Sequence, residues 1–303
     1  MIKVNGIPII LDKFPNGETL VSTNHLNKYE GVIDRIRVEF QWFNDEDLLH
    51  LYFVLEHLTN IGASHRDIYI YYMPYSRMDR KQNGNCFTLR YATRLLRECL
   101  TIHDKVYVLE PHSDVTLNLL NFSMNLAEKI EVVNKLSHKI LQLHPEIDMI
   151  CYPDKGAKER FKDDKLDLPI VFCNKVRDFD TGEIKGLELN GDIDVKDKNI
   201  LILDDLCSKG GTFYHTANKL KENGANNIYL GVCHMEQTVK EGYLLGGKVP
   251  YQTPIKHIYC FDTMFHQTVA KHLMCAYDNI TVFDTEEFLY NNQMFRKVLW
   301  DDV

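Results

Sequence analysis

The sequence predicts an α/β protein with two similar domains, each a mainly parallel sheet flanked by helices. Apolar runs without alternation, such as Ile-Leu-Ile-Leu at 200–203, are typical of strands buried on both faces. Runs of this kind alternate along the chain with segments of helical apolar spacing, as in parallel sheets covered by helices. With 303 residues, the chain is long enough for two separate cores.

The first half of the chain carries one series of these elements. Asn5-Gly6 is a type I′ hairpin signal between residues 2–4 and 7–11, and a turn follows at 14–18. The later elements predicted here are strands at 34–40, 67–73 and 105–109, a helix capped by Asn44 and ended by Gly62, and a helix at 88–100.

A second series fills the rest of the chain, with strands at 147–151, 169–173, 200–203, 227–232 and 256–260, and helices after the first and third of these, reaching about 162 and 224. Residues 177–191 lack a clear period and predict a mobile loop. We expect domains at 1–135 and 136–285, and in the C-terminal segment 286–303 a helix at 286–299 that packs back on one of the two halves, with the N-terminal domain as the candidate.

Composition excludes several classes of protein. With 35 basic and 43 acidic residues, the net charge of -8 implies no general attraction to nucleic acid or to an anionic membrane. No segment approaches the length of a membrane span. The eight cysteines are scattered without a Cys-x-x-Cys pair, which argues against a zinc site or a disulfide framework. We therefore expect a soluble cytoplasmic protein with neither a nucleic-acid nor a membrane partner.

The run Asp204-Asp-Leu-Cys-Ser-Lys-Gly-Gly-Thr212 follows the apolar strand 200–203 directly. Gly210 and Gly211 let the backbone turn tightly and bring its N–H groups to an anion, and Thr212 is expected to cap the following helix. Asp204 and Asp205 lie where α/β sheets bind ligands, and they suit ribose hydroxyls or a divalent cation. A plain turn with solvated acids is the competing interpretation of the acid pair alone.

A second group of charges lies in the loop at 72–81, which holds Arg77, Arg80 and Lys81. A solvated run of charge is one interpretation. The other is a triphosphate site, because this loop leaves the carboxyl end of a predicted strand.

The run 204–212 resembles the phosphoribosyl-diphosphate loop of type I phosphoribosyltransferases and of ribose-phosphate diphosphokinases (PRPP synthetases). Over about 14–235, further segments resemble PRPP synthetase motifs in the order of that family: Phe14-Pro-Asn-Gly-Glu18 (Phe-x-Asp-Gly-Glu), Pro74-Tyr-Ser-Arg-Met-Asp-Arg-Lys81 (Tyr-Ala-Arg-Gln-Asp-Arg-Lys), Glu110-Pro-His112 (Asp-Leu-His), Tyr152-Pro-Asp-Lys-Gly156 (Ser-Pro-Asp-x-Gly-Gly) and Asn174-Lys-Val-Arg177 (Lys-x-Arg). The resemblance implies tandem type I phosphoribosyltransferase-like domains.

The resemblance also implies a role for each matched residue. The implied ATP contacts are Arg77 and Asp79, with Phe14 and Glu18 reaching the adenine of a neighbouring subunit in a homo-oligomer. The implied metal residues, for Mg²⁺, are His112 and Asp154, and the implied catalytic residues are Lys175, Arg177 and His112. The implied ribose-phosphate residues are Asp204, Asp205, Ser208, Lys209, Gly210, Gly211 and Thr212.

The chain departs from the family pattern at several positions. Met78 replaces Gln, Ala157 replaces the second Gly, and Ser208-Lys209 replaces Asp-Thr. The last change makes the loop more positive by about two charges at neutral pH. Either Lys209 has drifted and points to solvent, or the loop takes an acceptor with more phosphate than ribose 5-phosphate, such as ADP-ribose.

We therefore predict a diphosphokinase that moves the β,γ-diphosphate of Mg-ATP to the C1 hydroxyl of ribose 5-phosphate, giving PRPP and AMP. The alternatives are the same transfer to ADP-ribose, a PRPP-consuming phosphoribosyltransferase, and a non-catalytic PRPP synthetase-associated regulator. The ATP-type motif around Arg77 argues against the second alternative, and the absence of Gly-x-x-x-x-Gly-Lys-Ser/Thr disfavours a P-loop NTPase.

Overall fold

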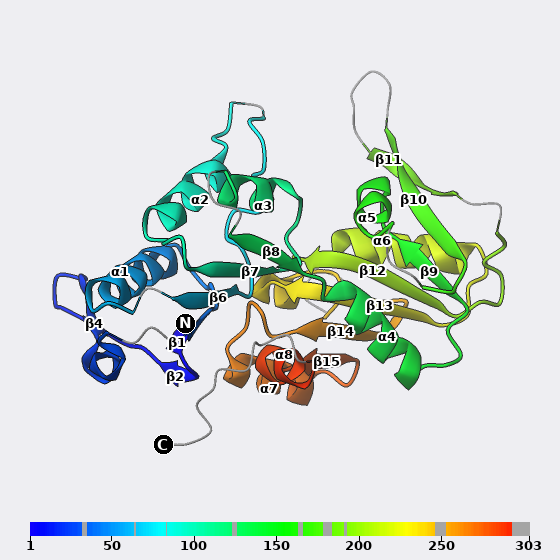
Figure 1. The fold of residues 1–303 in the computed structure, drawn as a ribbon. Helices are drawn as coiled ribbons and strands as arrows, with labels where there is room; N and C mark the ends of the chain where they lie inside the picture. The colour runs from blue at the N-terminus through cyan, green and yellow to red at the C-terminus, as the bar shows by residue number, and fades with distance from the viewer. Residues whose placement is uncertain are drawn as a thin grey trace. The chain divides into compact units, whose positions relative to one another are not determined.

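The computed structural model of the protein describes residues 1–31, 35–63, 65–82, 84–122, 126–162, 166–177, 184–190, 193–245 and 253–292. Of 175–177 and 184–186 it describes only the backbone. The chain divides into two compact units, one of Met1–Ile130 with Glu286–Val303 and the other of Glu131–Thr285. Both are α/β units built on a mainly parallel sheet, which confirms the predicted fold class (Figure 1).

The sheet of the first unit has the order β2-β1-β5-β6-β7-β8 in the described part of the chain. Strands β5 to β8 are parallel, and β1 is antiparallel to both of its neighbours. The strands are β1 (Ile2–Val4), β2 (Ile7–Pro8), β5 (Ile36–Phe40), β6 (Arg66–Ile70), β7 (Lys105–Leu109) and β8 (Ala127–Ile130). The helices between them are α1 (Glu46–Asn60), α2 (Thr88–Glu98) and α3 (Val115–Leu120).

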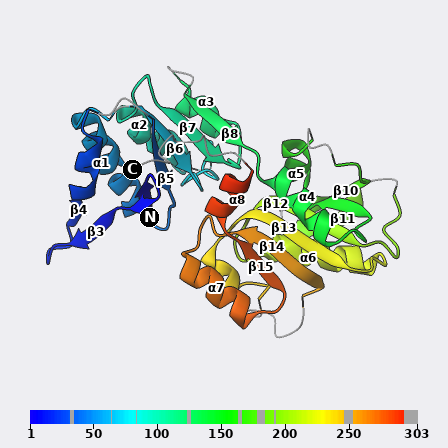
Figure 2. The ribbon, with the colours of Figure 1, turned by 60° about the horizontal axis from the view of Figure 1, so that its bottom comes forward.

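The N-terminal hairpin differs in part from the prediction. Asn5 and Gly6 both have positive φ, at 48° and 77°, as a type I′ turn requires. The predicted second strand is divided, because Ile9 turns inward and is buried while Ile10 is exposed. β3 (Ile10–Lys13) then pairs with β4 (Thr19–Ser22) in a separate two-stranded sheet (Figure 2).

The second unit has the order β11-β10-β9-β12-β13-β14-β15, again in the described part of the chain. Its strands are β9 (Met149–Tyr152), β10 (Ile170–Arg177), β11 (Ile184–Asn190), β12 (Ile200–Cys207), β13 (Ile228–Met235), β14 (Ile255–Phe261) and β15 (Ile280–Phe283). The helices are α4 (Val133–Leu143), α5 (Lys155–Arg160), α6 (Gly211–Glu222) and α7 (Gln267–Ala276). Figure 1 shows α4 and α6 on opposite sides of this sheet.

Strand β12 is the centre of the second unit. The four residues 200–203 are fully buried, as the unbroken apolar run predicted. Close packing against α4 explains Gly231 on the neighbouring β13, because a Cβ there would lie 2.8 Å from Ile140 and 2.9 Å from Leu203. Asp204 is the first polar residue of this strand and the first that is not fully buried.

The predicted mobile loop at 177–191 is wrong in part. Residues 184–190 form β11, which pairs antiparallel with β10, and residues 178–183 lie outside the described residues. An antiparallel edge strand needs no apolar run on both faces, so its sequence lacks the signal that revealed β12. The prediction also omitted β8, β15, α3, α4 and α7.

The terminal helix α8 (Thr285–Asn291) begins at the end of the second unit, and an ion pair between Lys3 of β1 and Glu286 ties it to the first unit. The predicted continuation to 299 lies beyond the described residues. All eight cysteines are free thiols, six of them buried. Within the described ranges, no helix is both long and apolar enough to cross a membrane.

Arg66 and Asp104 form a fully buried ion pair in the first unit, with 2.5 Å between Nη2 and Oδ2. Arg66 also donates to the carbonyl oxygens of Leu55 and Cys99 and to the hydroxyl of Thr59. These bonds join the start of β6 to α1, to the end of α2 and to the turn before β7. The pair therefore fixes the spacing of three elements around this sheet.

Arg66→Met should lower the free energy of unfolding by about 3–5 kcal/mol, because it leaves the Asp104 carboxylate buried without a partner. Arg94→Met is the matched control. Its guanidinium is 72% exposed and lies 3.9 Å from Glu98, so its loss should cost less than about 1 kcal/mol. Urea unfolding of the two variants measures the difference, and equal midpoints would show that the buried pair stabilises nothing.

Candidate active site

The acid pair lies in the second half of β12, which continues to Cys207, four residues beyond the predicted strand; Asp204 is half-buried and Asp205 is buried. Arg160, the last residue of α5, reaches both carboxylates: its Nη1 donates to Oδ1 of Asp204 at 2.9 Å and to Oδ1 of Asp205. The backbone N–H of Asp205 donates to the same Asp204 oxygen at 2.9 Å. Burial and the neighbouring charge of Asp205 raise the pKa of Asp204 well above its ordinary range, although Arg160 opposes the shift.

Arg160 is the residue that the sequence analysis missed. The acid pair could have indicated that such a residue exists, because two adjacent carboxylates on a buried strand require a cation or strong hydrogen-bond donors. The sequence could not say which cation, since Arg160 is 44 residues from Asp204 and only the packing of α5 beside β12 joins them. One guanidinium nitrogen serves both acids and holds them together.

Asp154 is the N-cap of α5, and its Oδ1 accepts a hydrogen bond from the N–H of Ala157 at 3.0 Å. This bond gives one carboxylate oxygen a structural task that the sequence analysis did not foresee. The side chain at 157 is buried, at 1% exposure. Asp154 and Arg160 thus lie at the two ends of one short helix, and Arg160 faces the acid pair.

The glycine loop connects β12 to α6. Gly210 is the N-cap of α6 and adopts the left-handed conformation, with φ of 76°. A Cβ on it would lie 2.4 Å from Cγ of Leu244, so both the turn and the close packing require glycine. The predicted capping by Thr212 is wrong: no side chain caps this helix, because Thr212 is already its second residue. The first turn therefore keeps its N–H groups for a ligand.

Ser208 and Lys209 differ in their surroundings. The Ser208 hydroxyl donates to Oε2 of Glu236 at 2.6 Å, and Thr238 donates to the same oxygen at 3.0 Å. The Lys209 side chain is exposed and has neither a hydrogen bond nor an ion pair within the described residues. Its backbone is fixed, because its carbonyl accepts from the N–H of Tyr243 at 2.8 Å. Lys209 is thus a fixed loop position with a cation available to a ligand.

In the first unit, the loops after β6 and β7 meet through Asp79. Its carboxylate accepts from Nε of Arg80 and from the hydroxyl of Ser113, both at 2.9 Å. Burial raises the pKa of Asp79, but these bonds and the charges of Arg80 and His112 outweigh burial and bring the pKa below its ordinary value. The structure therefore brings Asp79 and His112 together. Arg77 is exposed on the same loop.

Two residues other than glycine in these loops have left-handed backbones. Tyr75 has φ of 62° and Glu110 has φ of 36°. Such conformations cost roughly 1–3 kcal/mol each and persist where contacts hold them, often at functional sites. The Tyr75 hydroxyl donates to Asp45 at 2.6 Å, and Lys129 contacts the buried Glu110 at 2.9 Å. These contacts hold the two strained positions beside the candidate residues.

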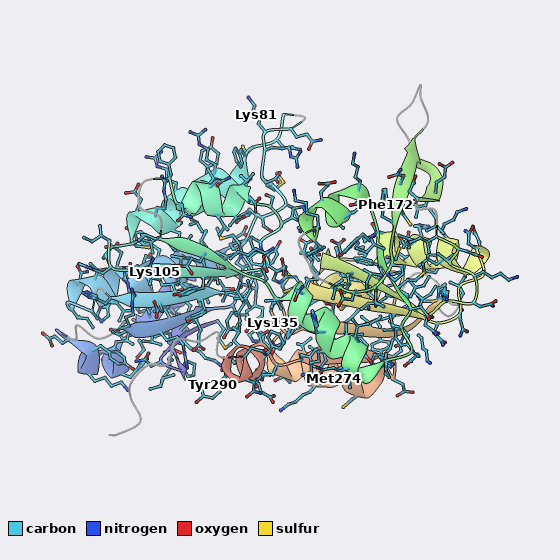
Figure 3. All side chains as sticks on the ribbon, turned by 45° about the vertical axis from the view of Figure 1, so that its right-hand side comes forward. Lys81, Lys105, Lys135, Phe172, Met274 and Tyr290 are labelled. Carbon is cyan, nitrogen blue, oxygen red and sulfur yellow. The ribbon has the colours of Figure 1, made fainter. Side chains whose placement is uncertain are left out.

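The remaining candidates are less closely defined. Phe14 and Glu18 close the β3–β4 hairpin, where the Phe14 ring is 49% exposed. Lys81 points away from the sheet into solvent (Figure 3). Lys175 and Arg177 lie on β10, opposite Leu187 and Ile184 of β11, and their side chains are outside the described part of the structure.

A magnesium ion would find hard oxygen ligands in the second unit, at Asp154 and at the acid pair. Among the described residues no three His, Cys, Asp or Glu side chains gather as a complete metal cage. Mg²⁺ seldom uses such a cage, because it keeps several waters and binds one or two carboxylates together with substrate phosphates. Burial and Asp205 raise the pKa of Asp204, and a cation bound nearby would favour the ionised form of this carboxylate. The donor set therefore fits Mg²⁺ that arrives with a phosphate substrate.

Two units of mainly parallel sheet, one of them with an acid pair and a glycine loop toward its carboxyl edge, define the class of α/β proteins that bind anionic ligands at the ends of their strands. Comparison with known proteins narrows this class. The chain is 30% identical to ribose-phosphate pyrophosphokinase of Pyrococcus abyssi over 235 residues, covering 76% of this chain and 77% of that protein. The chain belongs to the ribose-phosphate pyrophosphokinase family and is an enzyme of this type.

Other comparisons agree with the family. The protein of that name from Methanothermobacter thermautotrophicus is 26% identical over 265 residues, with 85% of each chain covered. The crystal structure of phosphoribosylpyrophosphate synthetase from Mycobacterium smegmatis has the same fold, with a TM-score of 0.72 at 20% identity over 94% of this chain and 88% of that chain. No family model matches the chain.

Arg160→Met should lower the free energy of unfolding of the second unit by about 3–5 kcal/mol, because both acids lose their shared cation. Adding Asp205→Asn should recover part of the loss, since one carboxylate then no longer repels the other. Lys162→Met, at an exposed residue just after α5, is the control. Chemical unfolding of the wild type, Arg160→Met, Asp205→Asn, the double variant and the control measures the coupling, and strictly additive losses would refute the shared contact.

Proposed function

We propose that the protein transfers the β,γ-diphosphate of ATP to the C1 hydroxyl of ribose 5-phosphate. The C1 oxygen forms a bond to the β-phosphorus, the bond from that phosphorus to the oxygen bridging to the α-phosphate breaks, AMP leaves with the electron pair, and the hydroxyl loses its proton. The products are PRPP and AMP. The observation that carries this proposal is the acid pair and glycine loop at the end of β12, in a chain of the ribose-phosphate pyrophosphokinase family.

The ribose 5-phosphate side is assigned to the second unit. The glycine loop offers N–H groups at the start of α6 to the 5-phosphate, and Asp204 with Asp205 accepts hydrogen bonds from ribose hydroxyls. Arg160 holds the two carboxylates in one orientation before substrate arrives. Because diphosphoryl transfer needs little covalent help from the protein, fixed orientation and cations on the phosphates supply most of the catalysis.

The ATP side is assigned to the first unit, through Arg77, Asp79 and His112. The contact between Asp79 and Ser113 and the two strained loop positions support this assignment, because they hold the two loops in one arrangement. Phe14 and Glu18 are proposed to contact the adenine bound by a neighbouring subunit. This role requires a homo-oligomer, which is part of the proposal.

Mg²⁺, bound with ATP, would neutralise charge on the phosphates, and we propose His112 in the first unit and Asp154 in the second unit as metal-binding residues, each considered within its own unit. The Oδ1 atom of Asp154 caps α5, which fixes the orientation of the carboxylate that we propose as a metal ligand. Lys175 and Arg177 are proposed to stabilise negative charge on the transferred group. The free and mostly buried cysteines support a cytoplasmic setting, and the net charge of -8 supports small-molecule partners alone.

A second acceptor, ADP-ribose, is favoured by one observation. Lys209 is exposed and unpaired within the described residues, on a backbone fixed by Tyr243, and the related loops carry a neutral residue at this position. A second phosphate attached to the 5-phosphate would lie near this loop and would gain a charge partner there. The terminal ribose of ADP-ribose has the same free C1 hydroxyl.

AMP release from Mg-ATP, followed by chromatography with ribose 5-phosphate, with ADP-ribose and without an acceptor, tests the function. We expect AMP only when an acceptor is present. If the acceptor carries a second phosphate, Lys209→Thr should lower kcat/KM for ADP-ribose by about tenfold while ribose 5-phosphate is little affected. An unchanged preference for ribose 5-phosphate would exclude Lys209 as a specificity residue, and no AMP with any acceptor would favour a non-catalytic regulator.

Lys175→Ala should lower kcat by roughly 100-fold or more with ATP binding largely intact, because the lost cation acts on charge that develops during transfer. Lys198→Ala, at an exposed lysine just before β12, is the matched control and should leave kcat unchanged. Steady-state rates and calorimetric ATP titration separate the two effects. Normal turnover in Lys175→Ala would remove this residue from the mechanism.

A further inference from the structure

Three aromatic side chains gather beside the glycine loop. The ring centroids of Tyr214 and Tyr243 are 5.6 Å apart, those of Tyr214 and His215 are 5.4 Å apart, and those of His215 and Tyr243 are 6.0 Å apart. Tyr214 and His215 belong to the first turns of α6, which starts at the loop. His215 is exposed and both tyrosines are half-buried. The cluster thus has one buried side and one side open to solvent.

Tyr243 is held directly against the loop. Its N–H donates to the carbonyl of Lys209 at 2.8 Å, and a Cβ on Gly211 would lie 3.3 Å from its ring. The preceding residue must be glycine, because a Cβ on Gly242 would lie 1.9 Å from the Lys209 oxygen. The Tyr243 ring is therefore a fixed neighbour of the residues that we assign to the phosphate.

Ribose 5-phosphate contains no aromatic group, so it offers nothing for these rings to stack on. The loop and the acid pair already supply hydrogen-bond groups for its phosphate and its hydroxyls. An aromatic cluster beside a phosphate loop suits a nucleobase, because bases stack on Tyr and His rings. Lys209, exposed on the same loop, suits the additional phosphate that joins a base to the ribose phosphate.

We propose that His215 and Tyr243 form a stacking platform for the base of a nucleoside diphosphate-linked ribose, with Lys209 on its diphosphate and the terminal ribose on the acid pair. This inference rests on the proposed function and names the class of acceptor. The acceptor is a ribose with a free C1 hydroxyl whose 5-phosphate is esterified to a nucleotide. Tyr214 packs beneath the platform and keeps the other two rings in position.

Equilibrium binding of ADP-ribose and of ribose 5-phosphate, measured by calorimetry without ATP, tests the platform. His215→Ala and Tyr243→Leu should each weaken ADP-ribose binding by roughly five- to 100-fold, as expected for the loss of one stacking contact. The ratio of the two affinities should fall, since ribose 5-phosphate has no base to lose. Tyr243→Phe should retain the wild-type ratio, because the ring remains.

His272→Ala, at an exposed histidine on α7, is the matched control and should leave both affinities unchanged. Equal weakening of both ligands in Tyr243→Leu and His215→Ala would overturn the proposal, because it would mean that the rings only support the loop. Unchanged ADP-ribose binding in these variants, or no ADP-ribose binding by the wild type, would overturn it too.

The outcomes also separate this proposal from the proposed function. AMP released with ribose 5-phosphate by a protein that does not bind ADP-ribose would refute the platform and leave the diphosphokinase intact. Ring-dependent binding of ADP-ribose, with no AMP released with either acceptor, would refute the reaction and leave the platform as a binding site.

Discussion

Two adjacent carboxylates on the central, largely buried strand of the sheet are the constraint on which the second unit depends. β12 has no room for polar groups until Asp204, where the side chains emerge next to each other and repel. Arg160 relieves the repulsion by donating from Nη1 to both carboxylates, and this holds α5 beside β12. Because Asp154 caps the other end of α5, the acid pair, the arginine and the capping carboxylate form one connected arrangement.

Close packing also determines the conformation of the glycine loop that follows β12. Gly210 needs a left-handed backbone and lies against Leu244, and Gly242 lies against the carbonyl of Lys209. The chain after β13 therefore packs on the glycine loop and covers one side of it. The first turn of α6, left without a side-chain cap, keeps its N–H groups for an anion. The loop that we propose for the phosphate is thus shaped by packing that leaves no room for side chains at Gly210 and Gly242.

The glycine loop differs from the family pattern at Ser208 and Lys209. Ser208 turns its hydroxyl to Glu236, so it contributes to the loop's structure and leaves Lys209 as the free cation of the described loop. Aromatic rings stand beside that cation. The exposed lysine and the neighbouring rings are the observations on which the proposal of a larger acceptor than ribose 5-phosphate rests.

The sequence alone determined the fold class and the place of the acid pair, because buried parallel strands leave unbroken apolar runs that end in polar residues. It also determined the family, through motifs of short range. It could not give β11, whose edge position requires no apolar signature, or the uncapped start of α6, which Thr212 seemed able to cap. Arg160, Tyr243 and Gly242 reach the site from other elements, so only tertiary packing could bring them there. Neighbouring residues reveal a local motif, because they are adjacent in the sequence. A counterion 44 residues away reaches the motif only through the packing of a helix on the sheet.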